Sequence, residues 1–499
     1  MKTLQLVALL AWSALSAPCY SEVITDGYFQ DNMLLQQDRP VVIWGTGEPG
    51  EKVDLSFCGE RKRAVVDDAG EWELVLSARI AGGEACTLSV NDLEINNIIF
   101  GDLWIASGQS NMLRPLLLSD TYGDFADVDD PQLRLLRHDL QVPLKGAYTE
   151  EQYALSNLQN LFKAQWQPSE GIGKGKFSAV AWYFGRMLRE ELDIPIGVIQ
   201  LAVGGSSMAE WIRLDTMQQN PRLAEMIENW PDDPMVGEGR RKRFEANFQE
   251  IIDGGTYRKY AGPTRHHMEP SVLFDAGIRP LQKVNFKGFI WYQGEANAPR
   301  PEDFNILLPM LVSDWRSFFN QGELPFYYVQ LPSYRYETWP EVREVQRKLA
   351  TVIPNSDMVV TIDLGLENDI HPTDKKPVGE RLARLALSET YGRGIPWQYP
   401  LPVAYGFSGE DLLLSYDHYG EGLRSDSKDI SGFEAENCVG VISPLKAEIV
   451  AEGQIRLIAV PGSLRSVRYA YKPFAKAVVN LWNSYGLPAA PFVFNFRCK

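Results

Sequence analysis

The chain has 499 residues, of which 45% are apolar and 23% are charged. This is the composition of an ordinary globular protein, and the length suggests about three domains. Its 65 acidic and 49 basic residues give a net charge of −16. Because binding to phosphate backbones or anionic lipids requires a basic face, this charge argues against nucleic acids and membrane surfaces as partners.

The first residues have the pattern of a secretory signal peptide. Met1 and Lys2 precede a mostly apolar run at residues 4–17, which is too short for a permanent membrane span. We predict that residues 1–21 are a signal peptide and that the protein is secreted or periplasmic. A lipid anchor on Cys19 is the alternative, although Pro18 is a poor fit to the small residue that such processing requires. No later stretch reaches about 18 uninterrupted apolar residues, so no membrane span is expected.

Removal of this signal peptide leaves an even number of cysteines. They are Cys58, Cys86, Cys438 and Cys498. Two lie near each end of the chain, so the local pairs Cys58 with Cys86 and Cys438 with Cys498 are the simplest of the three connectivities. In an oxidising compartment each disulfide would contribute about 2–4 kcal/mol to stability.

The pattern of apolar residues divides the rest of the chain into three parts. Residues 22–100 contain short strands between turns and predict a β-sandwich domain. Residues 101–394 alternate strands with helices, which predicts a parallel sheet with helices on both faces. Residues 395–499 return to a β-rich composition, and residues near 221–270 interrupt the alternation as an insertion beside the site. The strands expected in the central part lie at residues 103–106, 197–202, 289–292, 326–330 and 358–362, with a helix at 178–192 that Ser178 caps.

Three of these strands are followed by residues that an esterase would need, namely Ser110, Gly205 and Gln293. The carboxyl ends of parallel strands meet at one edge of a sheet, where open α/β proteins bind ligands. A serine nucleophile requires a base, donors for the oxyanion and a sharp turn that exposes it. Ser110 is therefore the candidate nucleophile, with the backbone amide of Gly205 and the side-chain amide of Gln293 as donors. Taken singly, each has an ordinary structural explanation: a helix cap, a turn and a loop contact.

The candidate base is His371, one of five histidines, because it follows the last predicted strand across a loop and precedes a helical pattern. His266 and His267 are the reserve pair. The acid that orients the imidazole stays open: Asp369 is the first choice, Asn368 could act only through its carbonyl oxygen, and a dyad without an acid is the third case. The chain has no His-Glu-x-x-His and no paired Cys-x-x-Cys, so neither a metal nor another cofactor is expected.

The segments that carry these residues resemble the motif blocks of the SGNH (GDSL-like) hydrolase superfamily. Nearly end to end, the chain is similar to the bacterial sialate O-acetylesterase family. This resemblance implies a three-layer α/β/α, flavodoxin-like core flanked by β-sandwich-like domains. It also implies Ser110 as nucleophile, His371 as base, and Ser110, Gly205 and Gln293 as the oxyanion hole. The matching blocks are residues 101–112, 195–205, 291–295 and 369–372.

Two positions depart from the family pattern. Asn368 stands where the superfamily often has the triad aspartate, and Leu113 and Arg114 follow the nucleophile block where many relatives have an acidic or aromatic residue. We also expect side chains beside the motifs to contact the substrate: Gln109, Asn111, Glu295 and Arg114.

The resemblance implies a carbohydrate O-acetylesterase that forms an acetyl-enzyme. A sialate ester is the favoured substrate, and its carboxylate would need a partner such as Arg114, Arg265 or Arg279. Acetylated xylan or another hemicellulose is the alternative. A non-catalytic glycan-binding protein is the alternative of another class, because the chain has 13 tryptophans. The sequence does not indicate the oligomeric state.

Overall fold

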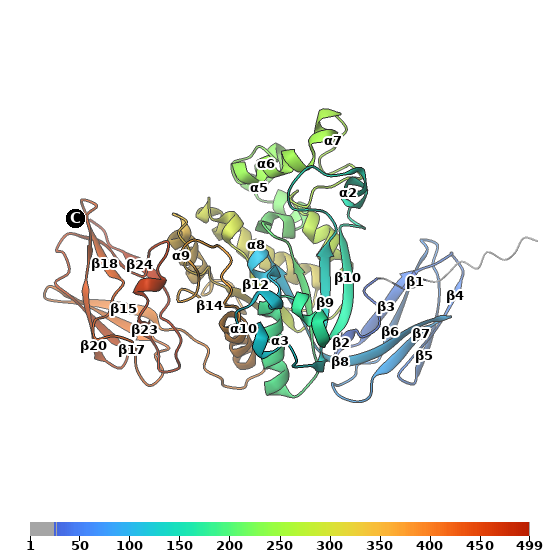
Figure 1. Ribbon diagram of the computed structural model, residues 1–499, viewed down its shortest axis with the longest axis horizontal. Coiled ribbons are helices and arrows are strands. Elements are labelled where there is room, and N and C mark those ends of the chain that lie inside the picture. Colours follow the sequence, from blue (N-terminus) through green and yellow to red (C-terminus); the bar gives the residue numbers. More distant parts are fainter. Residues whose placement is uncertain (1–23, 26, 499) are drawn as a thin grey trace, which may run out of the picture.

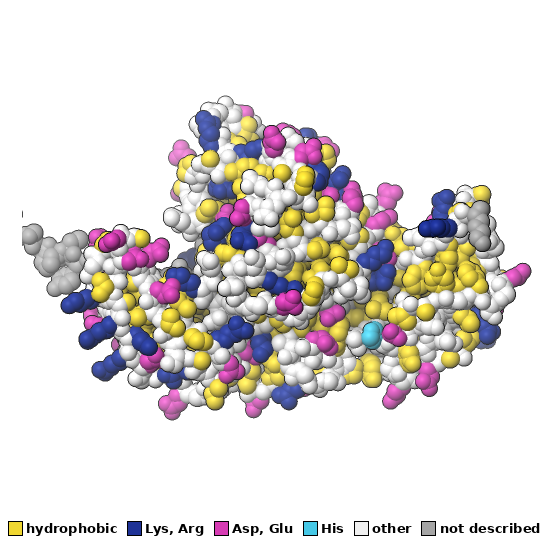
Figure 2. All heavy atoms as spheres, turned by 180° about the vertical axis from the view of Figure 1, so that it is seen from behind, with side chains coloured by type: hydrophobic (Ala, Val, Ile, Leu, Met, Phe, Trp, Pro, Cys, Tyr) yellow, Lys and Arg dark blue, Asp and Glu magenta, His cyan; other side chains and the backbone are white. Residues whose placement is uncertain are grey.

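The computed structural model describes residues 24, 25 and 27–498. The predicted signal peptide and Cys19 lie outside the described residues. Figure 1 shows a central α/β region between two groups of β-sheets, one from each end of the chain. Acidic and basic side chains are scattered over the face in Figure 2, and apolar side chains gather at its C-terminal end. Exposed apolar residues of that end include Val403, Tyr405 and Phe407.

The central sheet has the strand order β10-β9-β11-β8-β12-β13-β14. All neighbours pair in parallel except β10, which is antiparallel to β9 at the edge. The sequence analysis predicted a wholly parallel sheet and did not locate β9 or β10. An antiparallel neighbour needs no crossover helix, so the alternation of strands and helices does not reveal it. The strands are β8 (Leu93–Gly108), β9 (Asp130–Leu140), β10 (Phe162–Ser169), β11 (Ile196–Ala202), β12 (Gly288–Tyr292), β13 (Phe326–Val329) and β14 (Ser356–Val359).

Strands β11, β12 and β13 are buried along their whole length, as expected for a sheet that is covered on both faces. Helix α3 begins after Ser178, whose hydroxyl accepts a hydrogen bond from the Ala181 N–H, so the predicted cap is confirmed. Helices α3 and α10 pack against each other and against the strands. The helices of this region are α1 (Ser110–Leu113), α2 (Glu150–Leu155), α3 (Ala179–Leu192), α4 (Leu214–Gln218), α8 (Phe304–Phe319), α9 (Trp339–Leu349) and α10 (Lys376–Glu389).

The interruption near residues 221–270 folds into three short helices. They are α5 (Pro221–Asn229), α6 (Glu238–Asn247) and α7 (Gln249–Asp253), and they project together beyond the central region in Figure 1. Packed aromatic rings hold this segment together; Phe244, for example, lies against Trp230, Tyr257 and His266. The short basic run that the sequence shows at residues 239–243 belongs to α6.

The N-terminal sheets connect directly to the central sheet. Strand β8 has 16 residues; its first half pairs with β7 and β2, and its second half pairs with β11 and β12. Residue 100, the expected end of the first domain, therefore lies inside one continuous strand. The other strands are β1 (Ile24–Thr25), β2 (Leu34–Gln36), β3 (Val41–Thr46), β4 (Lys52–Phe57), β5 (Glu60–Val65), β6 (Glu71–Leu76) and β7 (Cys86–Val90).

The C-terminal part forms two four-stranded antiparallel sheets and one short pair of strands. Buried and more exposed residues alternate in several of these strands, as in Asp411–Asp417, because one face packs inward and the other is more accessible to solvent. The first sheet contains β15 (Leu401–Ser408), β16 (Asp411–Asp417), β20 (Lys446–Ala451) and β21 (Gln454–Ile458). The second contains β18 (Phe433–Asn437), β19 (Ile442–Pro444), β22 (Leu464–Tyr469) and β24 (Phe492–Asn495), and the pair is β17 (Arg424–Ser425) with β23 (Leu481–Trp482).

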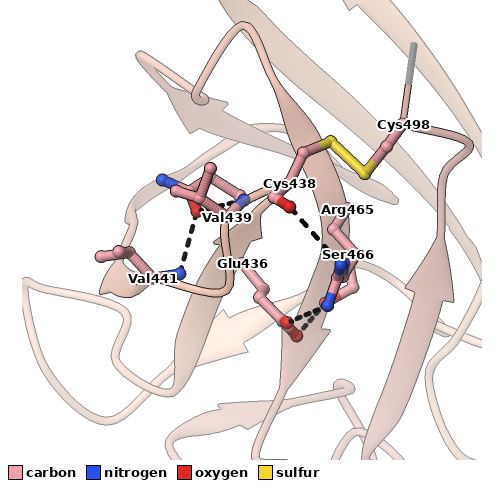
Figure 3. The surroundings of a disulfide bond; sticks show 8 residues. Glu436, Cys438, Val439, Val441, Arg465, Ser466 and Cys498 are labelled. Atoms are coloured by element: carbon pink, nitrogen blue, oxygen red, sulfur yellow. Dashed lines mark hydrogen bonds and ion pairs between the residues drawn. A yellow bond between two sulfur atoms is a disulfide. The ribbon is translucent and has the colours of Figure 1, made fainter.

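Both predicted disulfides are present. Cys58 bonds to Cys86 and Cys438 bonds to Cys498, with Cα atoms 5.5 Å and 5.7 Å apart. Figure 3 shows the second bond, beside which Arg465 pairs with Glu436. Structural disulfides are typical of oxidising compartments. Within residues 24–498, apart from residue 26, no helix combines the length and apolar character that crossing a bilayer requires.

Candidate active site

The ends of three neighbouring strands bring the predicted motifs together. In the register of the sheet, Gly108 of β8 lies between Ala202 of β11 and Tyr292 of β12. The residues that follow each strand therefore leave the sheet side by side at its carboxyl edge. This arrangement confirms the convergence that the sequence predicts for these three segments.

A sharp turn after β8 presents Ser110. Gly108 has φ +135°, and a Cβ atom there would lie 2.1 Å from the carbonyl oxygen of Tyr292, so only glycine fits. The N–H of Gln109 then donates to the same Tyr292 oxygen at 3.0 Å. Ser110 is the first residue of α1, so its own N–H has no partner within the helix.

His371 contacts Ser110 directly. The distance between His371 Nε2 and Ser110 Oγ is 2.9 Å, within hydrogen-bond range. Partial burial lowers the pKa of His371 below its ordinary value; nearby Lys375 and Arg114 lower it further, and Asp369 opposes them. The imidazole is therefore neutral, and able to accept a proton, at a lower pH than an ordinary histidine.

Neither candidate acid makes a hydrogen bond to the imidazole. The Asp369 carboxylate accepts the backbone N–H of His371 at 2.8 Å, but its distance to His371 Nδ1 is 3.8 Å and its side chain is 55% exposed. The side-chain carbonyl oxygen of Asn368 accepts a hydrogen bond from the Arg335 guanidinium instead. The contact between Ser110 and His371 is thus much closer than any contact between His371 and an acid.

The backbone N–H groups of Ser110 and Gly205 are available to bind an anion. Gly204 lies against Ser110, since a Cβ atom on Gly204 would be 3.9 Å from the Ser110 Cβ. Gly205 follows with φ +76°, a conformation that favours glycine. Among the described residues, no hydrogen-bond acceptor engages the backbone N–H of Gly205 or of Ser110.

Gln293 is buried next to these groups, but its amide is already engaged. Its Nε2 donates to the carbonyl oxygen of Ser206 at 3.2 Å and to Asn297 Oδ1 at 2.7 Å. Asn297 Oδ1 also accepts the backbone N–H of Met208, and this bond establishes the orientation of both amides. Both N–H donors of Gln293 are therefore used within the protein, and neither remains for an oxyanion.

A buried network links the nucleophile turn to the histidine loop. The side chain of Asn111 is fully buried; it donates to Glu295 at 2.5 Å and to the carbonyl oxygen of Ile370 at 2.9 Å, and it accepts from Lys375 at 2.6 Å. Burial lowers the pKa of Lys375 to about 7 and raises that of Glu295. Asn111, the residue after Ser110, is thus bonded to Ile370, the residue before His371.

Ser110 and His371 open into a cleft of about 700 Å³. Gln109 and Glu295 line it as well, whereas Asn111 and Arg114 are not among its lining residues. The side-chain Oε1 of Gln109 accepts the Ala296 N–H at 3.1 Å and so orders the loop after β12. The insertion contributes six further lining residues: Val236, Gly237, Glu238, Gly239, Arg240 and Arg243.

Comparison with known proteins shows the family of this chain. A family described as "Carbohydrate esterase, sialic acid-specific acetylesterase" matches residues 267–388. The chain is 30% identical to the sialate O-acetylesterase of Mus musculus, over 93% of each chain. The chain belongs to the sialate O-acetylesterase family.

Further relatives agree with this assignment. The Homo sapiens sialate O-acetylesterase is 28% identical over 93% of this chain and 91% of its own length. The crystal structure of a carbohydrate acetylesterase from Xanthomonas citri matches with a TM-score of 0.77 and 25% identity, covering 95% of this chain and 100% of that chain. The protein is accordingly a carboxylic-ester hydrolase.

Several residues that the sequence analysis considered for the site of this esterase do not line the cleft. Arg265 pairs with the buried Glu269 at 2.8 Å, and Arg279 pairs with Asp275 at 2.6 Å, so both guanidinium groups are already engaged. His266 and His267 are buried within the insertion, away from the cleft lining, and burial lowers the pKa of both. The described residues contain no group of three or more histidine, cysteine or acidic side chains placed to hold a metal ion.

The sequence analysis did not identify Lys375, which bonds to Asn111, or Arg243, which lines the cleft. Lys375 lies at the start of α10, where a lysine ordinarily faces solvent, and only its complete burial sets it apart. Arg243 belongs to a basic run that has the pattern of a solvated helix face. In both cases the signal is tertiary burial, which a single sequence does not display.

Proposed function

We propose that this protein is a carbohydrate O-acetylesterase that removes acetyl groups from sialic acids through an acetyl-enzyme. The observation that carries the proposal is the 2.9 Å contact between His371 Nε2 and Ser110 Oγ at the carboxyl edge of the sheet. Sialate esters are the favoured substrates because the relatives that match most of the chain are named sialate O-acetylesterases.

In the first half of the reaction, Ser110 Oγ attacks the acetyl carbonyl carbon while His371 Nε2 takes the hydroxyl proton. The N–H groups of Ser110 and Gly205 bind the negative charge that develops on the carbonyl oxygen. The bond between the acetyl carbon and the sugar oxygen then breaks. His371 returns its proton to that oxygen, so a sugar hydroxyl leaves and acetyl-Ser110 remains.

In the second half, a water molecule attacks the acetyl carbon while His371 takes one of its protons. The bond to Ser110 breaks, acetate is released, and the proton on His371 returns to Ser110 Oγ. A water molecule and an acetyl ester thus give an alcohol and acetic acid, which ionises to acetate and a proton. No other reactant is required.

The supporting residues have different proposed roles. Gln293 positions the loop after β12 rather than donating to the oxyanion, since its amide is engaged by Ser206 and Asn297. Asn111 positions the histidine loop, whereas Gln109 and Glu295 line the cleft near the substrate. Asp369 positions the backbone of His371, and the pair Ser110–His371 works as a dyad.

The proposal also covers the domain organisation of the chain, the location of the protein and its branch of the family. The described topology supports an SGNH-type α/β/α core at residues 101–394 with an insertion near 221–270, and β-sandwich-like domains at residues 22–100 and 395–499. The two disulfides support a secreted or periplasmic location. Membership of the bacterial branch of the family rests on the sequence motifs.

The substitution Ser110→Ala tests the proposed nucleophile. Acetate release from an acetylated sialic acid and from an aryl acetate is expected to fall at least about 10³-fold, with an unchanged melting temperature. Ser77→Ala, at an exposed position of the N-terminal region, is the matched control and should leave the rate unchanged. Undiminished turnover by Ser110→Ala would contradict the assignment.

The unaltered protein tests the two alternative functions. Glycan binding without acetate release would favour the glycan-binding alternative. Faster acetate release from acetylated xylan than from an acetylated sialic acid would replace the proposed substrate.

A further inference from the structure

One wall of the cleft carries positive charge that the protein itself does not neutralise. Two basic side chains of the insertion line the cleft, Arg240 and Arg243, and Lys145 lines it as well. Arg240 forms an ion pair with the buried Glu210. Within the described part of the chain, the Arg243 guanidinium has neither an ion pair nor a hydrogen bond, although the residue is partly buried. Burial and the neighbouring Arg240 both lower the pKa of Arg243, and no acidic group opposes them.

Arg243 lies directly beside the groups proposed to bind the oxyanion. Its Nη1 is 2.6 Å from the position that a Cβ atom on Gly205 would occupy. Gly205, Ser110 and His371 line the same cleft. The guanidinium therefore faces the space next to the acetyl group, where the rest of the sugar has to lie.

The acidic residues of the cleft do not cancel this charge. Glu238 is exposed and pairs with Lys242 at 2.5 Å. Glu295 accepts a hydrogen bond from the buried side chain of Asn111. The cleft is thus locally positive in a chain whose net charge is −16. A local positive potential of this kind attracts an anionic group into the cleft in spite of the negative net charge.

We propose that Arg243 binds the carboxylate of the substrate, so that the enzyme selects acetyl esters of carboxylate-bearing sugars over esters of neutral sugars. This inference rests on the proposed function and names the group that gives it specificity. A guanidinium presents two parallel N–H groups that match the two oxygens of a carboxylate. The arginines that the sequence analysis considered do not compete for this role, because Arg265 and Arg279 are paired and Arg114 does not line the cleft.

The test compares kcat/KM for three substrates: an acetylated sialic acid, the methyl ester of the same compound, and an aryl acetate. Methylation removes the charge and leaves the acetyl group intact. The unaltered enzyme is expected to prefer the free acid over its methyl ester by about 10- to 100-fold, the range for a hydrogen-bonded charged pair. Arg243→Gln should lose this preference while hydrolysing the aryl acetate within about twofold of the normal rate, and Arg243→Lys should keep part of it.

Arg258→Gln is the matched control, because Arg258 is an exposed arginine of the same insertion that bonds only to nearby backbone carbonyls. This variant should keep the full preference. An equal loss on all three substrates in Arg243→Gln would overturn the inference, since it would mean that Arg243 supports the fold or the oxyanion. Indifference of the unaltered enzyme to methylation would overturn it as well, and this comparison requires no variant. Neither result affects the proposed nucleophile, whose failure would appear as undiminished turnover by Ser110→Ala.

Discussion

The two sides of the active site are held in different ways. On the nucleophile side, Ser110 and Gly205 follow adjacent parallel strands, and the backbone of Gly108 touches the backbone of Tyr292. On the base side, His371 belongs to a loop whose position depends on side chains, chiefly Asn111 and its hydrogen bond to the Ile370 carbonyl oxygen. Backbone geometry tolerates almost no substitution, whereas a side-chain network loses one bond at a time.

The nucleophile side should fail completely when its backbone contact is broken. Gly108→Ala places a Cβ atom 2.1 Å from the Tyr292 oxygen in an unfavourable φ region, and we expect it to reduce the free energy of unfolding by about 4 kcal/mol and to abolish acetate release. Gly50→Ala separates the two causes, because Gly50 has φ +86° with no atom within 4 Å of the new Cβ, and it should cost only about 1–2 kcal/mol. Denaturant unfolding measures both. Equal effects would show that the contact with Tyr292 is unimportant.

On the base side, the loss of a single hydrogen bond should reduce activity only in part. Lys375→Met removes the hydrogen bond to Asn111 and leaves Glu295 without its neighbouring cation, so the histidine loop loses part of its support. We expect kcat for an aryl acetate to fall about 10- to 100-fold with little change in KM, because a misplaced base affects the chemical step. Lys376→Met, which alters a loose surface pair, should change kcat less than about twofold. A rise in KM at constant kcat would instead place Lys375 in substrate binding.

The smallest effect is expected at Asp369. A buried triad aspartate is worth about 10⁴-fold in kcat, but Asp369 is exposed and 3.8 Å from the imidazole, so Asp369→Asn should reduce kcat less than about tenfold. The Asp369 charge raises the pKa of His371, so its removal should move the acidic limb of the pH–rate profile to lower pH. The profile of the unaltered enzyme should already have this limb below pH 6.5. A 10³-fold loss in kcat would restore Asp369 as a full triad member.

The same contrast explains what the sequence could predict. The end of β8 and the strands β11 and β12 are short apolar runs followed by glycine and polar residues, a local pattern, and from them the sequence located the edge where Ser110 and Gly205 meet. The disulfide pairs also followed from counting and proximity along the chain.

Roles that depend on tertiary contacts were out of reach. The buried hydrogen bond between Lys375 and Asn111, the bond from the Gln293 amide to Ser206, and the position of Arg243 beside Gly205 each join residues far apart in the chain. The edge strand β10 was missed because it pairs antiparallel with β9, and such a neighbour needs no crossover helix to mark it in the sequence.

The central claim is that Ser110 Oγ is a nucleophile activated by His371. Labelling with a fluorophosphonate, followed by mass measurement of the peptides, tests it directly, because this reagent reacts with activated serines. We predict a single adduct on the peptide that contains Ser110, no adduct in Ser110→Ala, and labelling at least about 10²-fold slower in His371→Gln. An adduct on another serine, or a labelling rate that does not depend on His371, would contradict the account.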